Sequence, residues 1–110
     1  MRHSLKREVV LAGAARTPAG RFGGALSTVP ATELGAVAVR GALDRAEVEA
    51  TDVDYTVMGN MLSAGLGQTP ARQASIGAGI PETVSAMTLN KACASGLASV
   101  ILAAQVVQLG

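Results

Sequence analysis

Aromatic residues are nearly absent from this chain of 110 residues, which contains one Phe, one Tyr and no Trp. Proteins that bind nucleic acid stack bases on aromatic side chains and present a basic surface to the phosphates. Here nine Lys and Arg balance eight Asp and Glu, which leaves a formal net charge of +1. We therefore expect no nucleic-acid partner.

Cysteine and histidine are equally scarce, with one residue of each. A single Cys cannot form an internal disulfide, and one Cys with one His cannot fill a four-coordinate zinc site. We therefore expect no metal site. Because disulfides belong to oxidising compartments, we expect a reducing one and a cytoplasmic location.

Charged residues make up only 15% of the chain, against a typical share of about 25%, and hydrophobic residues make up 49%. This balance excludes intrinsic disorder of the whole chain. What the sequence has in excess is 21 Ala and 13 Gly. With no internal repeat and no linker, the length predicts one small domain whose core consists of small aliphatic side chains.

The first residues, Met1–Glu8, are basic like the start of a signal peptide. The residues after Glu8 include no long leucine-rich run and no cleavage site, so we interpret residues 1–7 as a polar tail. A short transit peptide is the alternative, although Glu8 comes early and an amphipathic Ser-rich stretch is missing.

Apolar runs and alternating segments predict three strands, each followed by a helix. The first run is apolar throughout, which is typical of a strand buried on both faces. The order of elements predicts an α/β fold with a mainly parallel sheet. The strands are predicted over residues 9–15, 53–58 and 86–89, and the helices from Ser27, Thr28 and Pro30, over 71–76 after Thr69 and Pro70, and over 91–109.

The last predicted helix has no charged residue after Lys91 and is apolar on most of its circumference. Such a helix is either buried on every side or lies in a membrane. A span needs about 20 predominantly apolar residues, whereas this segment contains Ser95, Ser99, Gln105 and Gln108. We expect no membrane partner. Three strands and two other helices cannot surround this helix, so we expect another surface to cover it.

The single cysteine, Cys93, lies where the third strand turns into this helix. Unpaired N–H groups and the positive end of the helix dipole stabilise a thiolate at such a place, which suits a nucleophile. Small neighbours, from Ala92 to Gly96, let a substrate carbonyl approach, and the Cys93 N–H can help to hold an oxyanion. The alternative is an inert, buried cysteine.

A nucleophilic cysteine normally needs a base and a group that orients the base. The only histidine, His3, lies in the polar tail, where we interpret it as a solvated surface residue. Either Cys93 is inert, or its partners lie outside these residues.

Four segments closely resemble, in order and spacing, the amino-terminal part of thiolases, the acetyl-CoA acetyltransferase family. They are Ala15–Gly24, Met58–Leu62, Gly67–Gln73 and Asn90–Leu97. The resemblance implies a thiolase-like fold in which residues 8–110 form a partial amino-terminal βαβαβα unit of a layered αβαβα architecture. The loop domain and the carboxy-terminal half of the family are absent from these residues.

The resemblance makes Cys93 the catalytic residue, which attacks an acyl-CoA thioester and carries the acyl group. In degradation it would attack a 3-ketoacyl-CoA and release acetyl-CoA. The family's activating His and second Cys come from the carboxy-terminal half, so only Cys93 is carried over, with no coenzyme A-binding residue. The resemblance further implies fatty acid metabolism, coenzyme A thioesters as substrates without another cofactor, and a homo-oligomer (dimer or tetramer).

The other matched segments carry more modest predictions. Position 94 is Ala where Gly is common in the family, which affects only acyl-chain preference. We expect the loop Arg16–Gly24 to be structural and Gly59–Gln73 to lie near a subunit interface, with Arg72 either an interface residue or a surface charge. Two alternatives to an active enzyme piece stay open. One is a catalytically silent chain, either a truncated product or a module that associates with another polypeptide, and the other is a fragment of a related condensing enzyme of fatty acid synthesis.

Overall fold

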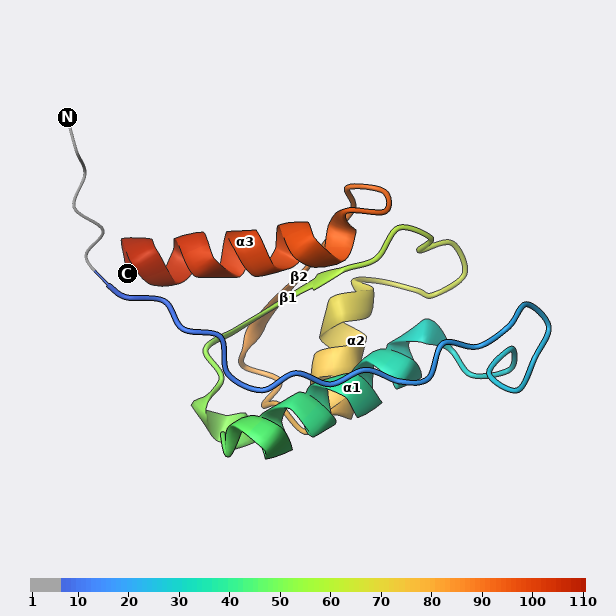
Figure 1. The fold of residues 1–110 in the computed structure, drawn as a ribbon, viewed down its shortest axis with the longest axis horizontal. Helices are drawn as coiled ribbons and strands as arrows, with labels where there is room; N and C mark the ends of the chain where they lie inside the picture. Colours follow the sequence, from blue (N-terminus) through green and yellow to red (C-terminus); the bar gives the residue numbers. More distant parts are fainter. Residues whose placement is uncertain (1–6) are drawn as a thin grey trace.

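A computed structural model of the chain describes residues 7–110. His3 and nearly all of the predicted polar tail lie outside the described residues. Helices and strands alternate along the described part (Figure 1). They are α1 (Ala31–Ala46), a short 3-10 helix η1 (Ala50–Asp52), β1 (Tyr55–Gly59), α2 (Pro70–Gly77), β2 (Ser85–Leu89) and α3 (Ser95–Leu109).

The two strands form a parallel pair with α2 as the connection between them. The register runs from Tyr55 opposite Ser85 to Gly59 opposite Leu89, and the Asn60 N–H donates to the Leu89 carbonyl at 3.0 Å. Parallel strands need such a crossover, usually a helix, because after the first strand the chain must return to the edge where that strand began. Both strands therefore end at the same edge, immediately before the loops that start at Asn60 and Asn90.

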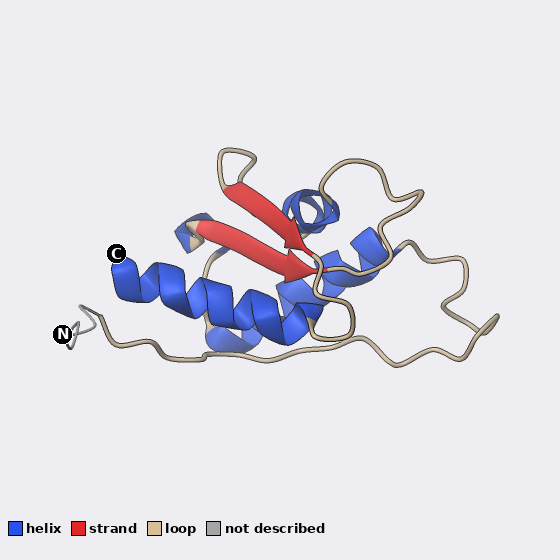
Figure 2. Ribbon diagram, turned by 90° about the horizontal axis from the view of Figure 1, so that it is seen from above, coloured by secondary structure: helices blue, strands red, loops and turns tan. Residues whose placement is uncertain are grey.

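The sheet lies between two layers of helix. α3 packs on one face, mainly against β1, while α2 contacts both strands on the other face and α1 packs on α2. Figure 1 shows this order, and Figure 2 shows the two parallel strands with α3 next to them. The arrangement is a partial α/β fold, as the sequence predicted.

The core between the layers consists of small side chains, which confirms the prediction from the Ala and Gly excess. Its buried hydrophobic members are Ala36, Ala71, Ala74, Ala78 and Ile80. Where α1 crosses α2, a Cβ on Gly35 would lie 3.0 Å from the Ala74 Cβ, and one on Gly77 would lie 3.1 Å from the Ala36 Cβ. Larger residues at these crossings would push the helices apart.

The predicted first strand, residues 9–15, does not form. The segment is extended but pairs with no strand, and its central residues are exposed, Val10 at 75% and Leu11 at 83%. It lies instead along α1, where the Arg45 guanidinium donates to the Ala14 carbonyl and a Cβ added to Gly13 would collide with Ala42 and Ala46. A strand forms only where another strand accepts its hydrogen bonds, and among the described residues only β1 and β2 pair.

The helix starts also differ from the prediction. Ser27 and Thr28 do not cap α1, since Pro30 holds its N-cap position without a side-chain bond. Thr69 precedes Pro70 as expected, but its φ is 40° and its hydroxyl caps nothing in α2. The last helix begins at Ser95 rather than Lys91, because residues 91–94 form a turn.

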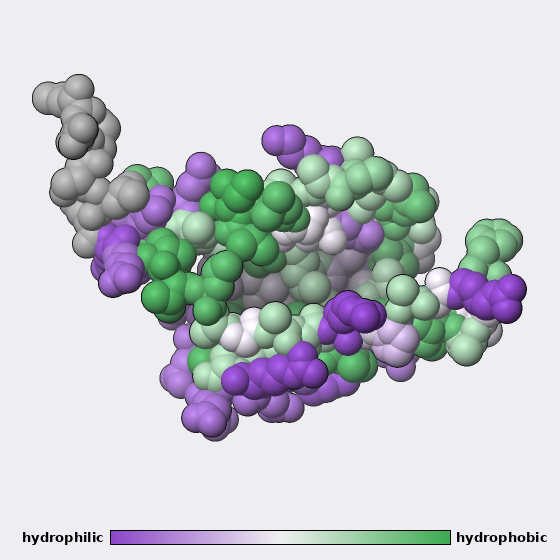
Figure 3. Space-filling view, viewed as in Figure 1, coloured by the Kyte–Doolittle hydropathy of each residue, from purple (hydrophilic) through white to green (hydrophobic). Residues whose placement is uncertain are grey.

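α3 is largely uncovered within the described residues. An 18-residue window, Ala92–Leu109, has a mean hydropathy of 1.7 but is only 11% buried. By length and composition alone it could cross a membrane, a property that core helices of water-soluble folds share. Figure 3 shows hydrophobic side chains gathered over α3. Below it a recess of about 450 Å³ is lined mostly by apolar residues of α1, β1 and α3.

Candidate active site

Cys93 lies in the turn between β2 and α3, with its side chain exposed and its thiol free. α3 starts two residues later, and its first bonds include one from the Ala98 N–H to the Ala94 carbonyl at 2.9 Å. The thiol therefore precedes the first turn of a 15-residue helix, where the helix dipole is positive. The predicted strand-to-helix placement of Cys93 is confirmed. Its side chain is exposed among residues 7–110 rather than buried, and the reactivity of the thiol stays a prediction.

The turn itself holds an unusual backbone conformation at Ala92, whose φ is 48°. Residues with a Cβ rarely adopt this left-handed region. The Ala92 N–H donates to the Asn90 Oδ1 at 2.9 Å, and its carbonyl accepts from the Ser95 Oγ at 2.6 Å. The Ser95 hydroxyl also accepts from the Lys91 N–H at 2.8 Å. The side chains of Asn90 and Ser95 thus hold the backbone next to Cys93 by hydrogen bonds.

The end of β1 packs closely against the residues that follow this turn. A Cβ placed on Gly59 would overlap the carbonyl group of Ser95 and lie 2.6 Å from the Gly96 nitrogen. Only glycine allows the strand to come this close to the start of α3. The Asn90 Nδ2 adds a second link, donating to the Met61 carbonyl at 3.2 Å. β1, β2 and α3 therefore meet at the cysteine turn.

This meeting point is the edge where both parallel strands end, which is where ligands bind in open α/β sheets. A cavity of about 450 Å³ lies at the same edge, and Cys93 does not line it. Its lining includes Asn60, Thr69 and Asn90.

No side chain among residues 7–110 forms a hydrogen bond with the Cys93 thiol. Nor do these residues bring together three or more His, Cys, Asp or Glu that could hold a metal ion. The turn can present and orient a nucleophile, but the described part of the chain places no general base beside it.

Other predicted segments have local roles in the structure. The Arg16 Nη1 donates to the neighbouring Thr17 carbonyl at 3.2 Å, and Figures 1 and 2 both place the loop Arg16–Gly24 away from the cysteine turn. The Arg72 Nη1 lies 3.5 Å from the Val84 carbonyl, on an exposed side of α2. An interface role for Arg72 stays a prediction.

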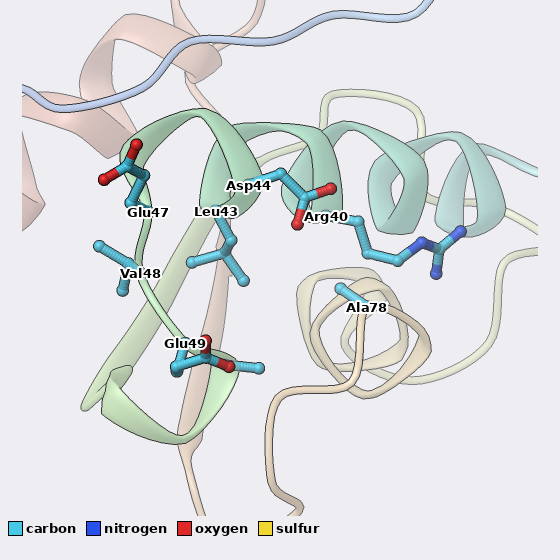
Figure 4. A pocket seen from close by; sticks show the side chains of 8 residues that line it. Arg40, Leu43, Asp44, Glu47, Val48, Glu49 and Ala78 are labelled. Carbon is cyan, nitrogen blue, oxygen red and sulfur yellow. The ribbon is translucent and has the colours of Figure 1, made fainter.

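Another pocket, of about 400 Å³, lies between the end of α1 and η1 (Figure 4). It carries Asp44, Glu47 and Glu49, but Glu47 points away from it. Arg40 extends toward the end of α2, where its guanidinium donates to the Gly77 carbonyl. This arrangement joins two helices, and we assign no chemistry to it.

Sequence reasoning finds Cys93 but misses the residues that hold its turn. The sequence presents Ser95 only as a small neighbour, and Asn90 and Gly59 only as parts of matched segments. One signal exists for Asn90, because an Asn two residues before a loop position commonly accepts a hydrogen bond from that residue's N–H. The contact of Gly59 with Ser95 has no signal, since 36 positions separate them.

The family model described as the thiolase N-terminal domain matches residues 9–110. Among curated relatives, acetyl-CoA acetyltransferase 2 of Arabidopsis thaliana is 56% identical over 104 residues, and acetyl-CoA acetyltransferase of Schizosaccharomyces pombe is 50% identical over 103. Each alignment covers 94% of this chain and 26% of the relative, so the chain spans about a quarter of their length.

A solved structure is similar as well. A thiolase from Ascaris suum, crystallised in complex with coenzyme A, superposes with a TM-score of 0.87 and 40% sequence identity. The match covers 89% of this chain and 26% of that one. The structural likeness and the sequence likeness thus each cover about a quarter of the matched proteins.

Proposed function

Since the chain belongs to the thiolase family through its N-terminal domain, we propose that Cys93 is the nucleophile of an acetyl-CoA acetyltransferase-type enzyme. The observation that carries the proposal is the exposed thiol on a tightly held turn before α3, in a chain whose relatives bear that enzyme's name. The match also favours thiolase over the related condensing enzymes.

The proposed step is acyl transfer to sulfur. The Cys93 thiolate attacks the carbonyl carbon of an acyl-CoA, forming a carbon–sulfur bond and a tetrahedral oxyanion. The bond from that carbon to the coenzyme A sulfur then breaks, and coenzyme A leaves as a thiolate that takes up a proton. The N–H groups of the neighbouring residues donate within the turn, and the Cys93 N–H is suited to the oxyanion, because such a donor stabilises charge as it develops. The acyl group stays on Cys93 as a thioester.

The second half of the reaction needs groups that these 110 residues do not contain. The resemblance assigns activation of the cysteine to a His and proton transfer at the α-carbon to a second Cys. The sequence has one Cys and one His, and that His lies in the tail. We therefore propose that this chain alone does not complete condensation or thiolysis, while the whole protein acts on acyl-CoA thioesters without a further cofactor.

The resemblance to thiolases also carries our proposals on the oligomeric state, location and metabolism of the whole protein. The whole protein is a homo-oligomer, with the region Gly59–Gln73 near a subunit interface. A cytoplasmic location fits the single unpaired cysteine, and fatty acid metabolism fits the substrate class. A second candidate function, an association module without catalysis, is favoured by one observation, the uncovered apolar surface of α3.

The test separates acyl transfer from turnover. The chain is incubated with acetyl-CoA and mapped by mass spectrometry, and we expect one acetyl group on Cys93 that hydroxylamine removes, as it does from thioesters. Cys93→Ala should take up none of this label, and neither chain should cleave acetoacetyl-CoA. A hydroxylamine-resistant acetyl group on Lys91 alone would favour the silent association module, and measurable thiolysis abolished by Cys93→Ser would contradict the predicted incompleteness.

A further inference from the structure

Building on the proposed role of Cys93, we propose that Ser95 is a positioning residue, whose hydroxyl holds the backbone turn that presents the thiol. Ser95 is 5% exposed and its side chain makes two hydrogen bonds, both within the turn. It accepts from the Lys91 N–H at 2.8 Å and donates to the Ala92 carbonyl at 2.6 Å. One hydroxyl thus links the residues on both sides of Cys93.

The turn needs such a restraint because of Ala92. A φ of 48° is unfavourable for a residue with a Cβ, and it persists only where the surroundings fix it. The Ala92 carbonyl receives both the N–H and the hydroxyl of Ser95, at 3.1 Å and 2.6 Å. Removing the hydroxyl leaves the Lys91 N–H without this acceptor and Ala92 with one restraint fewer.

Asn90 forms the second restraint on the same peptide. Its Oδ1 accepts from the Ala92 N–H at 2.9 Å and its Nδ2 donates to the Met61 carbonyl at 3.2 Å. Ser95 and Asn90 therefore hold the two ends of Ala92, the residue directly before the nucleophile. A shift at Ala92 changes the direction in which the Cys93 side chain leaves the backbone.

Ser99 offers a matched control one helical turn further along α3. It is buried to the same degree, at 6% exposed, and its hydroxyl donates to the Gly96 carbonyl at 2.6 Å. Ser99→Ala thus removes the same chemical group from the same helix without touching residues 90–93. Any effect specific to Ser95→Ala arises from the turn rather than from loss of a buried serine.

The first readout does not depend on acyl transfer. Cys93 is labelled with a trifluoroacetonyl group and its ¹⁹F spectrum is recorded in the 110-residue chain. We expect one narrow resonance in the unchanged chain and in Ser99→Ala, and a broadened or additional resonance in Ser95→Ala. A spectrum of Ser95→Ala that matches the unchanged chain would overturn the proposal. If Ser95→Ala loses its cooperative unfolding transition, the exposed Asn90→Ala decides by the same criterion.

The second readout is the rate of acetyl transfer from acetyl-CoA. A misplaced reacting group slows chemistry without weakening ground-state binding. We expect Ser95→Ala to lower the maximal rate about tenfold or more, with the half-saturating concentration unchanged and Ser99→Ala like the unchanged chain. An unaltered maximal rate in Ser95→Ala would also overturn the proposal. If the unchanged chain takes up no acetyl group, the proposed function fails, and the fluorine spectra alone decide the role of Ser95.

Discussion

Gly59 and Gly96 lie on opposite sides of the contact between β1 and α3, and they have very different room for a side chain. A Cβ on Gly59 would overlap Ser95, whereas a Cβ on Gly96 would meet nothing within 4 Å. We expect Gly59→Ala to lower the free energy of unfolding by about 1–3 kcal/mol, because the backbone of α3 must move away. Urea denaturation followed by circular dichroism measures the loss.

Gly96→Ala is the control for that experiment. Gly96 lies in α3 without a positive φ, and alanine favours a helix over glycine by about 0.8–1.0 kcal/mol. We expect it to leave stability unchanged or to raise it slightly. Equal stabilities of the two variants would show that β1 and α3 do not make the close contact described here.

At the residue scale, what the sequence reveals depends on how far apart the interacting residues are. The placement of Cys93 is predictable because it depends on a local pattern, a strand followed by a helix. Gly59 is not, because its importance arises from a residue that becomes its neighbour only after folding. Ser95 lies between these cases, since it contacts residues three and four positions away, but many serines in first turns make no such bond.

At the scale of elements, a single buried polar pair joins α2 to β1. The hydroxyls of Thr56 and Ser75 lie 3.0 Å apart, and the residues are 7% and 2% exposed. Removing one hydroxyl leaves the other buried without a hydrogen-bond partner, so we expect Ser75→Ala to lower the free energy of unfolding by about 1–3 kcal/mol. Chemical denaturation of the single variants and the double variant measures the pair.

The double variant Thr56→Val with Ser75→Ala tests the origin of that cost. Removing both hydroxyls leaves no buried group unpaired, so the double variant should lose less stability than the two single losses added together. A strictly additive result would mean that the two hydroxyls act independently and that the pair does not couple α2 to β1.

The elements differ in how well the sequence predicts them, and the reason is physical. β1, α2 and β2 begin and end within two residues of their predicted bounds, because alternation, Pro70 and the glycines act locally. Residues 9–15 have a strand-like composition, yet a strand exists only when another strand accepts its hydrogen bonds. Their apolar pattern predicts burial that the described residues do not provide, and they lie along α1 instead.

At the scale of the whole molecule, the two sides of the sheet differ in how well their helices are buried. α1 and α2 pack closely through alanine and glycine, while in α3 two serines are buried and large apolar side chains are exposed. The most exposed of these are Leu97, Ile101 and Leu109, at 67%, 51% and 80%. A contiguous apolar surface of this kind marks an interaction site or an aggregation liability.

We therefore expect the chain to self-associate through α3. Sedimentation velocity should show a sedimentation coefficient that rises with protein concentration, because association removes the apolar side chains from water. The double substitution Leu97→Lys with Ile101→Lys should shift the chain toward monomer, since it places two charges on the associating surface. Phe22→Lys is the matched control, because Phe22 is fully exposed on the loop Arg16–Gly24, away from α3 in both ribbon views. A concentration-independent monomer, or equal effects of the α3 and Phe22 substitutions, would show that this helix is not the associating surface.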